Sequence, residues 1–277
     1  MSDRIGILAG HGRLPVFFAA EAKRRGCEVA AIELAPGADP DLASVVHHWR
    51  PVSIGCWQEV IDTLHELRVS ALYLVGKVDK RLLYGGVQMD ARFLRILASL
   101  REKNDNRIVL AFVADLEREG FTIGDQRDFL TDLLAGNGPL TKSQPTPREW
   151  EDIAFGFRMA KGIAGLDIGQ TVVVKSGAVL AVEAIEGTDE CIMRGGSLGQ
   201  KDVVVVKVAK PHQDRRFDIP TFGLRTVETL AKARARVLAF EGDITFVMDR
   251  AETVALADRH GISLLGYAGE QHASGLM

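Results

Sequence analysis

The chain has 277 residues and a net charge of −3, with 47% hydrophobic and 26% charged residues, a composition typical of a fully folded globular protein. The weakly acidic charge argues against a general nucleic-acid binder, which needs a basic surface. The three cysteines are odd in number and far apart, so they form no zinc or disulfide pattern. No run approaches the roughly 18 apolar residues that span a membrane, and no signal peptide is recognisable. We therefore expect a cytoplasmic protein with no transmembrane segment and no nucleic-acid partner.

The first half of the chain alternates short apolar runs with helical patterns. Continuous apolar strands separated by helices are typical of a parallel sheet that is covered on both faces. The strands are expected at residues 4–9, 28–34 and 71–75, and the helices at 14–25, 57–67, 90–101 and 107–119.

Glycine, proline and small polar residues concentrate in one segment near the middle of the chain. We place a linker there, at 137–147, between an N-terminal domain of residues 1–136 and a C-terminal domain of residues 148–277. In the second domain the expected elements are a helix at 147–163, a hairpin at 172–182 turning at Ser176-Gly177, a strand at 203–208, and helices at 224–235 and 250–260. The predicted fold class is α/β, with a Rossmann-like parallel domain followed by a distinct C-terminal α/β domain.

The turn Gly10-His11-Gly12 follows the first strand and precedes a helix, as in a dinucleotide-binding fingerprint. Pro15 stands in place of the third glycine, and only Glu33 could serve as an acidic ribose ligand, which argues against a nicotinamide cofactor. Two interpretations remain open. The turn is either a tight strand-to-helix connection or a phosphate site made from helix N-terminal amides.

A charged segment lies between the strand at 203–208 and a proline turn. Two carboxylates four residues apart, Asp214 and Asp218, suit a divalent cation. Basic side chains that suit phosphate oxygens flank them: Lys210, Arg215 and Arg216. Charge pattern alone favours a solvated loop with surface ion pairs.

A strand pattern ends near Ala184, and a short helix is expected to begin with Thr188 as its N-cap. Capping accounts for this threonine without any function. The histidines show no metal-ligand spacing, so none is assigned a catalytic role.

Three blocks taken in order, residues 6–15, 183–189 and 210–223, resemble the LpxI family of UDP-2,3-diacylglucosamine pyrophosphatases. The similarity extends over nearly the whole chain, including 103–105 and 249–252. It implies a Mg²⁺-dependent hydrolase of lipid A biosynthesis that cleaves the pyrophosphate bond of UDP-2,3-diacylglucosamine. The implied products are UMP and 2,3-diacylglucosamine 1-phosphate (lipid X), and the implied assembly is a homodimer.

The same resemblance implies roles for individual residues. The essential aspartate of the family motif Arg-x-Asp-x-Pro-Thr-x-Gly falls on Asp218, and Arg216 is the matching arginine. Asp218 and Asp214 are the expected catalytic residues, and Asp218 is the expected Mg²⁺ ligand. The expected substrate-binding residues are Gly10, Gly12, Thr188, Lys210, Gln213 and Arg216. His11 departs from the commoner glycine of the family.

Two other functions are compatible with the residues. One is a non-catalytic protein that binds a lipid-linked nucleotide sugar, and the other is an oxidoreductase that uses a nucleotide cofactor at the glycine turn. A lipid-linked substrate is also compatible with a peripheral contact with the inner membrane surface.

Overall fold

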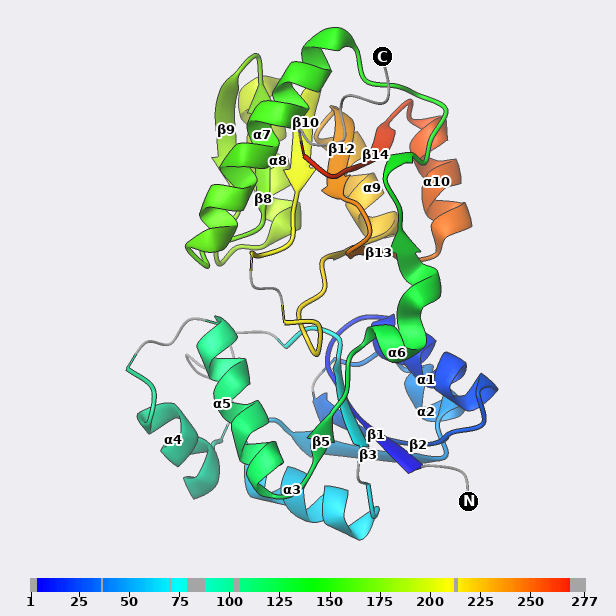
Figure 1. Cartoon of the computed structure of the whole chain (residues 1–277), viewed down its shortest axis with the longest axis vertical. Coiled ribbons are helices and arrows are strands. Elements are labelled where there is room, and N and C mark those ends of the chain that lie inside the picture. The colour runs from blue at the N-terminus through cyan, green and yellow to red at the C-terminus, as the bar shows by residue number, and fades with distance from the viewer. Residues whose placement is uncertain are drawn as a thin grey trace. The chain divides into compact units, whose positions relative to one another are not determined.

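A computed structural model of the chain describes residues 4–35, 37–69, 71–78, 88–101, 105–211 and 214–269. They form two compact units (Figure 1). Unit 1 comprises Met1–Thr131 together with the short segment Asp214–Asp218, and unit 2 comprises Asp132–Gln213 and Ile219–Met277. Across the described ranges, no helix combines the length and the apolar character that crossing a bilayer requires.

Unit 1 is built on a five-stranded sheet in the order β3-β2-β1-β4-β5, in which all neighbouring strands are parallel. This order is that of a Rossmann-like half-fold, so the predicted parallel domain is confirmed. The strands are β1 (Arg4–Ala9), β2 (Glu28–Ala35), β3 (His48–Ser53), β4 (Ala71–Val75) and β5 (Thr122–Ile123).

Helices cover both faces of this sheet. On one face Leu8 and Leu72 pack with residues of α3, α4 and α5. On the other face the ring of Phe18 in α1 lies 4.8 Å from that of Tyr73 and 4.9 Å from that of Phe129. The helices are α1 (Leu14–Arg24), α2 (Leu42–Val45), α3 (Trp57–Glu66), α4 (Ala91–Ala98), α5 (Asp105–Arg118) and α6 (Arg127–Leu130).

Unit 2 has a six-stranded mixed sheet in the order β7-β14-β12-β10-β8-β9 and a three-stranded sheet in the order β11-β13-β6. In the larger sheet β10, β12 and β14 are parallel, whereas β7, β8 and β9 pair antiparallel. The strands are β6 (Leu134–Ala135), β7 (Gly138–Pro139), β8 (Thr171–Lys175), β9 (Ala178–Val182), β10 (Val203–Lys207), β11 (Thr221–Phe222), β12 (Ala235–Glu241), β13 (Thr245–Val247) and β14 (Ser263–Tyr267).

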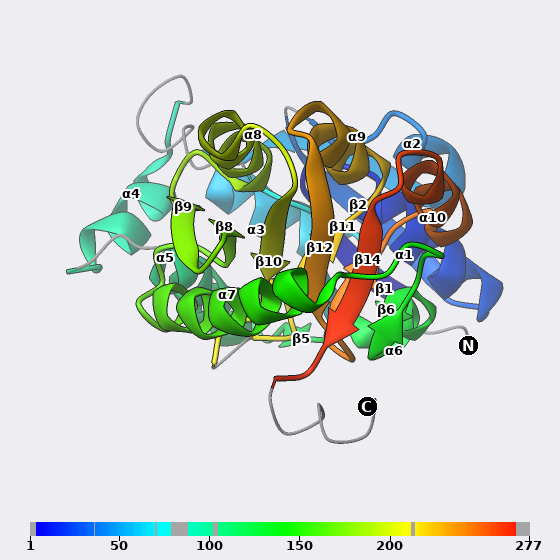
Figure 2. The ribbon, with the colours of Figure 1, turned by 90° about the horizontal axis from the view of Figure 1, so that it is seen from above.

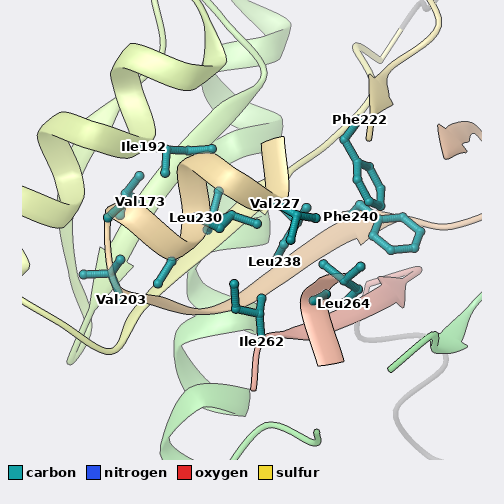
Figure 3. Close-up of a cluster of buried hydrophobic side chains, with 14 of the residues drawn as sticks. Val173, Ile192, Val203, Phe222, Val227, Leu230, Leu238, Phe240, Ile262 and Leu264 are labelled. Carbon is teal, nitrogen blue, oxygen red and sulfur yellow. The ribbon is translucent and has the colours of Figure 1, made fainter. Parts of the chain in front are cut away.

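The helix α7 covers one face of the larger sheet, and α8, α9 and α10 cover the other (Figure 2). Figure 3 shows the core beneath α8 and α9, in which Ile192 and Leu230 from these helices belong to the same cluster as Val203 from β10, and Phe222 lies beside Phe240 from β12. A short 3-10 helix (Thr131–Leu133) precedes β6. The α-helices are α7 (Pro147–Gly165), α8 (Thr188–Gly199), α9 (Leu224–Lys232) and α10 (Arg250–Arg259).

Two local predictions in unit 2 have opposite outcomes. The hairpin of β8 and β9 is confirmed, because Ser176 and Gly177 adopt the positive φ angles, 53° and 75°, that a tight two-residue turn requires. The N-cap assignment of Thr188 is wrong. Gly187, with φ of 88°, occupies the N-cap, and Thr188 is the first residue of a twelve-residue helix. Its hydroxyl bonds side chains rather than the backbone of the first turn.

Candidate active site

The glycine turn of unit 1 lies against the end of β4. The amide of Gly10 donates to the carbonyl of Val75 at 2.9 Å, and the amide of His11 donates to the carbonyl of Lys77 at 2.6 Å. A Cβ on Gly10 would lie 2.4 Å from the Lys77 carbonyl oxygen, so only glycine permits this approach. Gly12 has φ of 91°, a left-handed conformation that also favours glycine.

The helix after this turn begins without a side-chain cap. Arg13 is the N-cap residue of α1 and makes no capping hydrogen bond with its side chain, and Pro15 in the first turn has no amide hydrogen. The first-turn amides at this end carry partial positive charge. The amide of Val16, also in the first turn, donates to the carbonyl of Arg13 at 3.0 Å, so both interpretations of the glycine turn stay open.

The segment Asp214–Asp218 belongs to unit 1, although it lies far along the chain from the rest of that unit. Both carboxylate oxygens of Asp214 accept hydrogen bonds from Arg216, from Nε at 3.0 Å and from Nη2 at 2.7 Å. The backbone amide of Arg216 adds a third bond at 3.0 Å. We call this arrangement a fork: the carboxylate of an aspartate accepts hydrogen bonds from the guanidinium and the backbone amide of the arginine two residues later.

The fork sets the charge state of Asp214. Burial alone would raise the pKa of this carboxyl, but the hydrogen bonds from Arg216 outweigh burial and hold the pKa below its ordinary value. The guanidinium of Arg216 also bonds Glu117 at 2.9 Å. Asp214 is therefore a carboxylate that orients Arg216.

A second fork with the same spacing follows β5. Asp125 accepts from Arg127 Nη2 at 2.6 Å and from the Arg127 amide at 2.8 Å. Between them, the backbone amide of Gln126 donates to the carbonyl of Arg215 at 3.2 Å. This bond joins the charged segment to the residues that follow β5. Asp125 and Arg127 were not predicted as site residues, although the repeated Asp-x-Arg spacing is a signal that could have indicated them.

Asp218 ends the turn that Asp214 begins. Its backbone amide donates to the carbonyl of Asp214 at 3.2 Å, so one turn carries both predicted catalytic aspartates. The carboxyl ends of β4 and β5 and the glycine turn after β1 belong to the same edge of a parallel sheet. Ligands of open α/β sheets bind at this edge.

A different group of predicted residues lies in unit 2. Lys207 ends β10 with only 2% of its surface exposed, and its Nζ donates to the hydroxyl of Thr188 at 2.9 Å. That hydroxyl donates in turn to Glu183 at 2.8 Å. Burial would raise the pKa of Glu183, but the charge of Lys207 and hydrogen bonds lower it below its ordinary value. Sequence reasoning gave neither Glu183 nor Lys207 a role.

Lys210 follows β10 and forms an ion pair with Asp167, Nζ to Oδ1, at 2.7 Å. Nearby, Glu241 accepts from Lys161 at 2.9 Å and from the amide of Ala209 at 2.8 Å, which fixes the start of this segment. The predicted substrate-binding residue Gln213 lies outside the described residues, as do Lys103, Asn104 and His212 of the segments that carry the resemblance.

The donor set bears on whether Mg²⁺ fits. In the described part of the chain, no three His, Cys, Asp or Glu side chains gather into a ready-made metal site. Asp125 and Asp214 are engaged in forks. Mg²⁺ in phosphate-processing sites uses one or two protein carboxylates together with substrate oxygens and water. Asp218 fits such a role, because a substrate-borne ion needs no closed protein cage.

Models of known protein families match both halves of the chain. Models of the LpxI N-terminal domain and the LpxI C-terminal domain match residues 4–133 and 136–265. The chain belongs to the LpxI family. The UDP-2,3-diacylglucosamine pyrophosphatase LpxI of Caulobacter vibrioides is 32% identical over 274 residues, covering 95% of this chain and 97% of that protein. The resemblance predicted from three sequence blocks is confirmed, and with it the expectation that the chain is an enzyme.

Solved structures show only remote similarity to this LpxI protein. An ADP complex of N5-carboxyaminoimidazole ribonucleotide synthetase has a TM-score of 0.29 and 16% identity, covering 62% of this chain and 32% of that chain. The biotin carboxylase subunit of pyruvate carboxylase has a TM-score of 0.28 and 11% identity, covering 67% of this chain and 39% of that chain. This chain thus spans less than half of either protein, and scores this low carry no argument about function.

Proposed function

We propose that this LpxI protein hydrolyses the pyrophosphate bond of UDP-2,3-diacylglucosamine in lipid A biosynthesis and releases UMP and lipid X, with Mg²⁺ as cofactor. The observation that carries the proposal is the end-to-end similarity to the enzyme of that name, at 32% identity. The arrangement of Asp214, Arg216 and Asp218 at the carboxyl edge of the unit 1 sheet supports it.

Pyrophosphate cleavage requires neutralisation of charge on phosphoryl oxygens and an oriented water molecule, with little covalent help from the protein. Arg216 supplies a guanidinium whose orientation Asp214 fixes, which suits planar recognition of phosphate. Lys210 supplies a second cation. The turn around Gly10 and Gly12 is proposed to hold the pyrophosphate against the positively charged N-terminal end of α1.

Asp218 is the proposed ligand of Mg²⁺, or the residue that orients the attacking water. When bound, the ion would add charge stabilisation to phosphate oxygens. Thr188 and Gln213 are proposed to contact neutral oxygens of the substrate. The hydroxyl of Thr188 already donates to Glu183 and accepts from Lys207. It can therefore contact the substrate only by accepting a hydrogen bond from a substrate hydroxyl.

The test is turnover by the purified chain. Incubation with UDP-2,3-diacylglucosamine and Mg²⁺ should release UMP, detected by chromatography. EDTA should abolish release and added Mg²⁺ should restore it, because Arg127, Arg216 and Lys210 are each already paired with an aspartate and cannot neutralise a pyrophosphate unaided. Full activity in EDTA would contradict the metal requirement. Retention of the lipid sugar without UMP release would favour the binding protein, and quenching of nicotinamide fluorescence the oxidoreductase.

We further propose that the protein acts as a homodimer in the cytoplasm. A peripheral contact with the inner membrane surface is compatible with its lipid-linked substrate. Light scattering coupled to gel filtration should give twice the chain mass of 30.2 kDa. A single-chain mass at working concentration would contradict the dimer.

A further inference from the structure

Gln126 stands between the two forks and is one of the most deeply buried polar residues described. Its exposed fraction is 2%. The side-chain Nε2 donates to the carbonyl of Leu74 in β4 at 2.6 Å. The other end of the same amide, Oε1, is buried and has no hydrogen-bond partner among the residues that the structure describes. A buried acceptor without a donor is unfavourable, and native proteins rarely keep one without a reason.

The orientation of this amide is fixed by its partner. If the amide were flipped, Oε1 would face the carbonyl oxygen of Leu74, and two acceptors would oppose each other. Nε2 must therefore point to Leu74, and Oε1 is the end left without a partner.

Gln126 also lies where a ligand is expected. Its backbone amide holds Arg215 in the charged segment at 3.2 Å, and its side chain holds the end of β4. The next residue of that strand, Val75, accepts the amide of Gly10 in the glycine turn at 2.9 Å. One residue thus links two parts of the candidate site of unit 1 at the carboxyl edge of the sheet.

The chemistry of the partnerless atom excludes a phosphate contact. Phosphate oxygens and Oε1 are both acceptors, so Oε1 requires a hydrogen-bond donor. The arginines of the two forks, Arg127 and Arg216, already donate to Asp125 and Asp214. A uridine nucleotide carries two kinds of donor, the imide N–H of its base and the hydroxyls of its ribose.

We propose that Gln126 is a specificity-determining residue whose Oε1 accepts a hydrogen bond from the imide N–H of uracil. This inference rests on the proposed function, and it identifies Gln126 as the residue that selects the uridine nucleotide of the substrate. A planar amide that is held at one end and buried suits the planar edge of a base. Cytosine presents an acceptor at the same ring position, so it would oppose Oε1. Sites that pair a buried polar group with the substrate reject analogues that leave the group unpaired.

The experiment compares binding of UMP, N3-methyl-UMP, CMP and 2′-deoxy-UMP to the full-length protein by calorimetry. The wild type should bind UMP at least about tenfold more tightly than N3-methyl-UMP and CMP, as one lost hydrogen bond predicts. Gln126→Met should reduce that preference to within about twofold. The ratio of affinities does not change with the folded fraction of a variant, so partial unfolding does not produce the result.

Gln170→Met is the matched control, because Gln170 in unit 2 also has a buried Oε1 without a partner. It should leave the UMP preference unchanged. Equal binding of UMP and N3-methyl-UMP by the wild type overturns the inference without any variant. The inference is also overturned if the wild type binds UMP more tightly than 2′-deoxy-UMP and Gln126→Met removes that preference. Oε1 would then accept from the ribose hydroxyl rather than from the base. Release of UMP from the lipid sugar by the wild type is measured separately. If UMP is released but the binding preference is absent, the inference fails and the proposed function stands.

Discussion

The two units place charged groups at the ends of their strands in different ways. In unit 1 the forks join residues two apart in sequence, and their side chains remain partly exposed. In unit 2 the group of Lys207, Thr188 and Glu183 joins residues up to 24 apart in sequence, and its two charged members, Lys207 and Glu183, are buried. A fork forms within one loop, whereas the buried group exists only once α8, β9 and β10 have packed together.

This difference determines what each group can do. Partly exposed charges contribute little stability and are accessible to a charged substrate. Buried charges must be compensated, so they chiefly hold the strands and helix in place. We therefore propose that chemistry resides in the forked segment of unit 1, whereas Lys207 and Glu183 in unit 2 chiefly support structure.

The largest expected effect is on stability in unit 2. Lys207→Met should lower the free energy of unfolding by about 3 to 5 kcal/mol, because Glu183 would keep a buried charge without its cation. Urea denaturation followed by circular dichroism measures this. Adding Glu183→Gln to the variant should recover most of the loss. A Lys207→Met protein as stable as the wild type would contradict the buried-pair interpretation.

The matched variant in unit 1 is Arg216→Met. The Arg216 side chain is 30% exposed, so loss of its ion pairs should change stability by only about 0 to 1 kcal/mol. Equal destabilisation by the two variants would remove the contrast between the units.

The second prediction concerns catalysis in unit 1. Asp218→Asn keeps the shape of the side chain but removes its charge, so turnover should fall on the order of a hundredfold or more while the fold persists. UMP release and circular dichroism on the same sample check this. A variant that keeps more than about a tenth of wild-type turnover, a deficit under roughly 1.4 kcal/mol in the barrier, would contradict the catalytic assignment.

The sequence predicts elements well where burial is uniform. The strand β1 is buried at nearly every position and reads as a continuous apolar run, and the hairpin of β8 and β9 carries its own turn residues. The edge strand β3 was missed because most of its side chains lie outside the core and it contains Pro51, which argues against a strand.

The candidate site was only partly predictable for a related reason. Resemblance identified Asp214, Arg216 and Asp218, because they form a compact block. Nothing local marks Gln126, since its significance comes from Leu74 and Arg215, which are 52 and 89 residues away. The pairing of Lys207 with Thr188 is likewise tertiary, so Thr188 was read as a cap.

The third prediction uses pH to separate the units. The pKa of Glu183 lies below its ordinary value, because the effect of Lys207 exceeds that of burial. The carboxylate therefore stabilises the folded state above the pKa of the unfolded chain, and this contribution is lost as pH falls through the folded value. Unfolding free energy should decline with acidification, and less steeply in Glu183→Gln. Identical pH slopes for the two proteins would count against a charged Glu183.

The smallest expected effect is that of Asp214→Asn. Both oxygens of Asp214 already bond Arg216, so its charge acts by orienting the guanidinium rather than by meeting substrate directly. Turnover should therefore fall less than in Asp218→Asn. Stability should change by about 0 to 1 kcal/mol, because the pair is partly exposed. Asp125→Asn breaks a fork of the same geometry and is the control for stability. The contradicting result has two parts: Asp214→Asn lowers turnover as much as Asp218→Asn does, and Asp214→Asn and Asp125→Asn are equally stable. Asp214 would then have to act on the substrate itself.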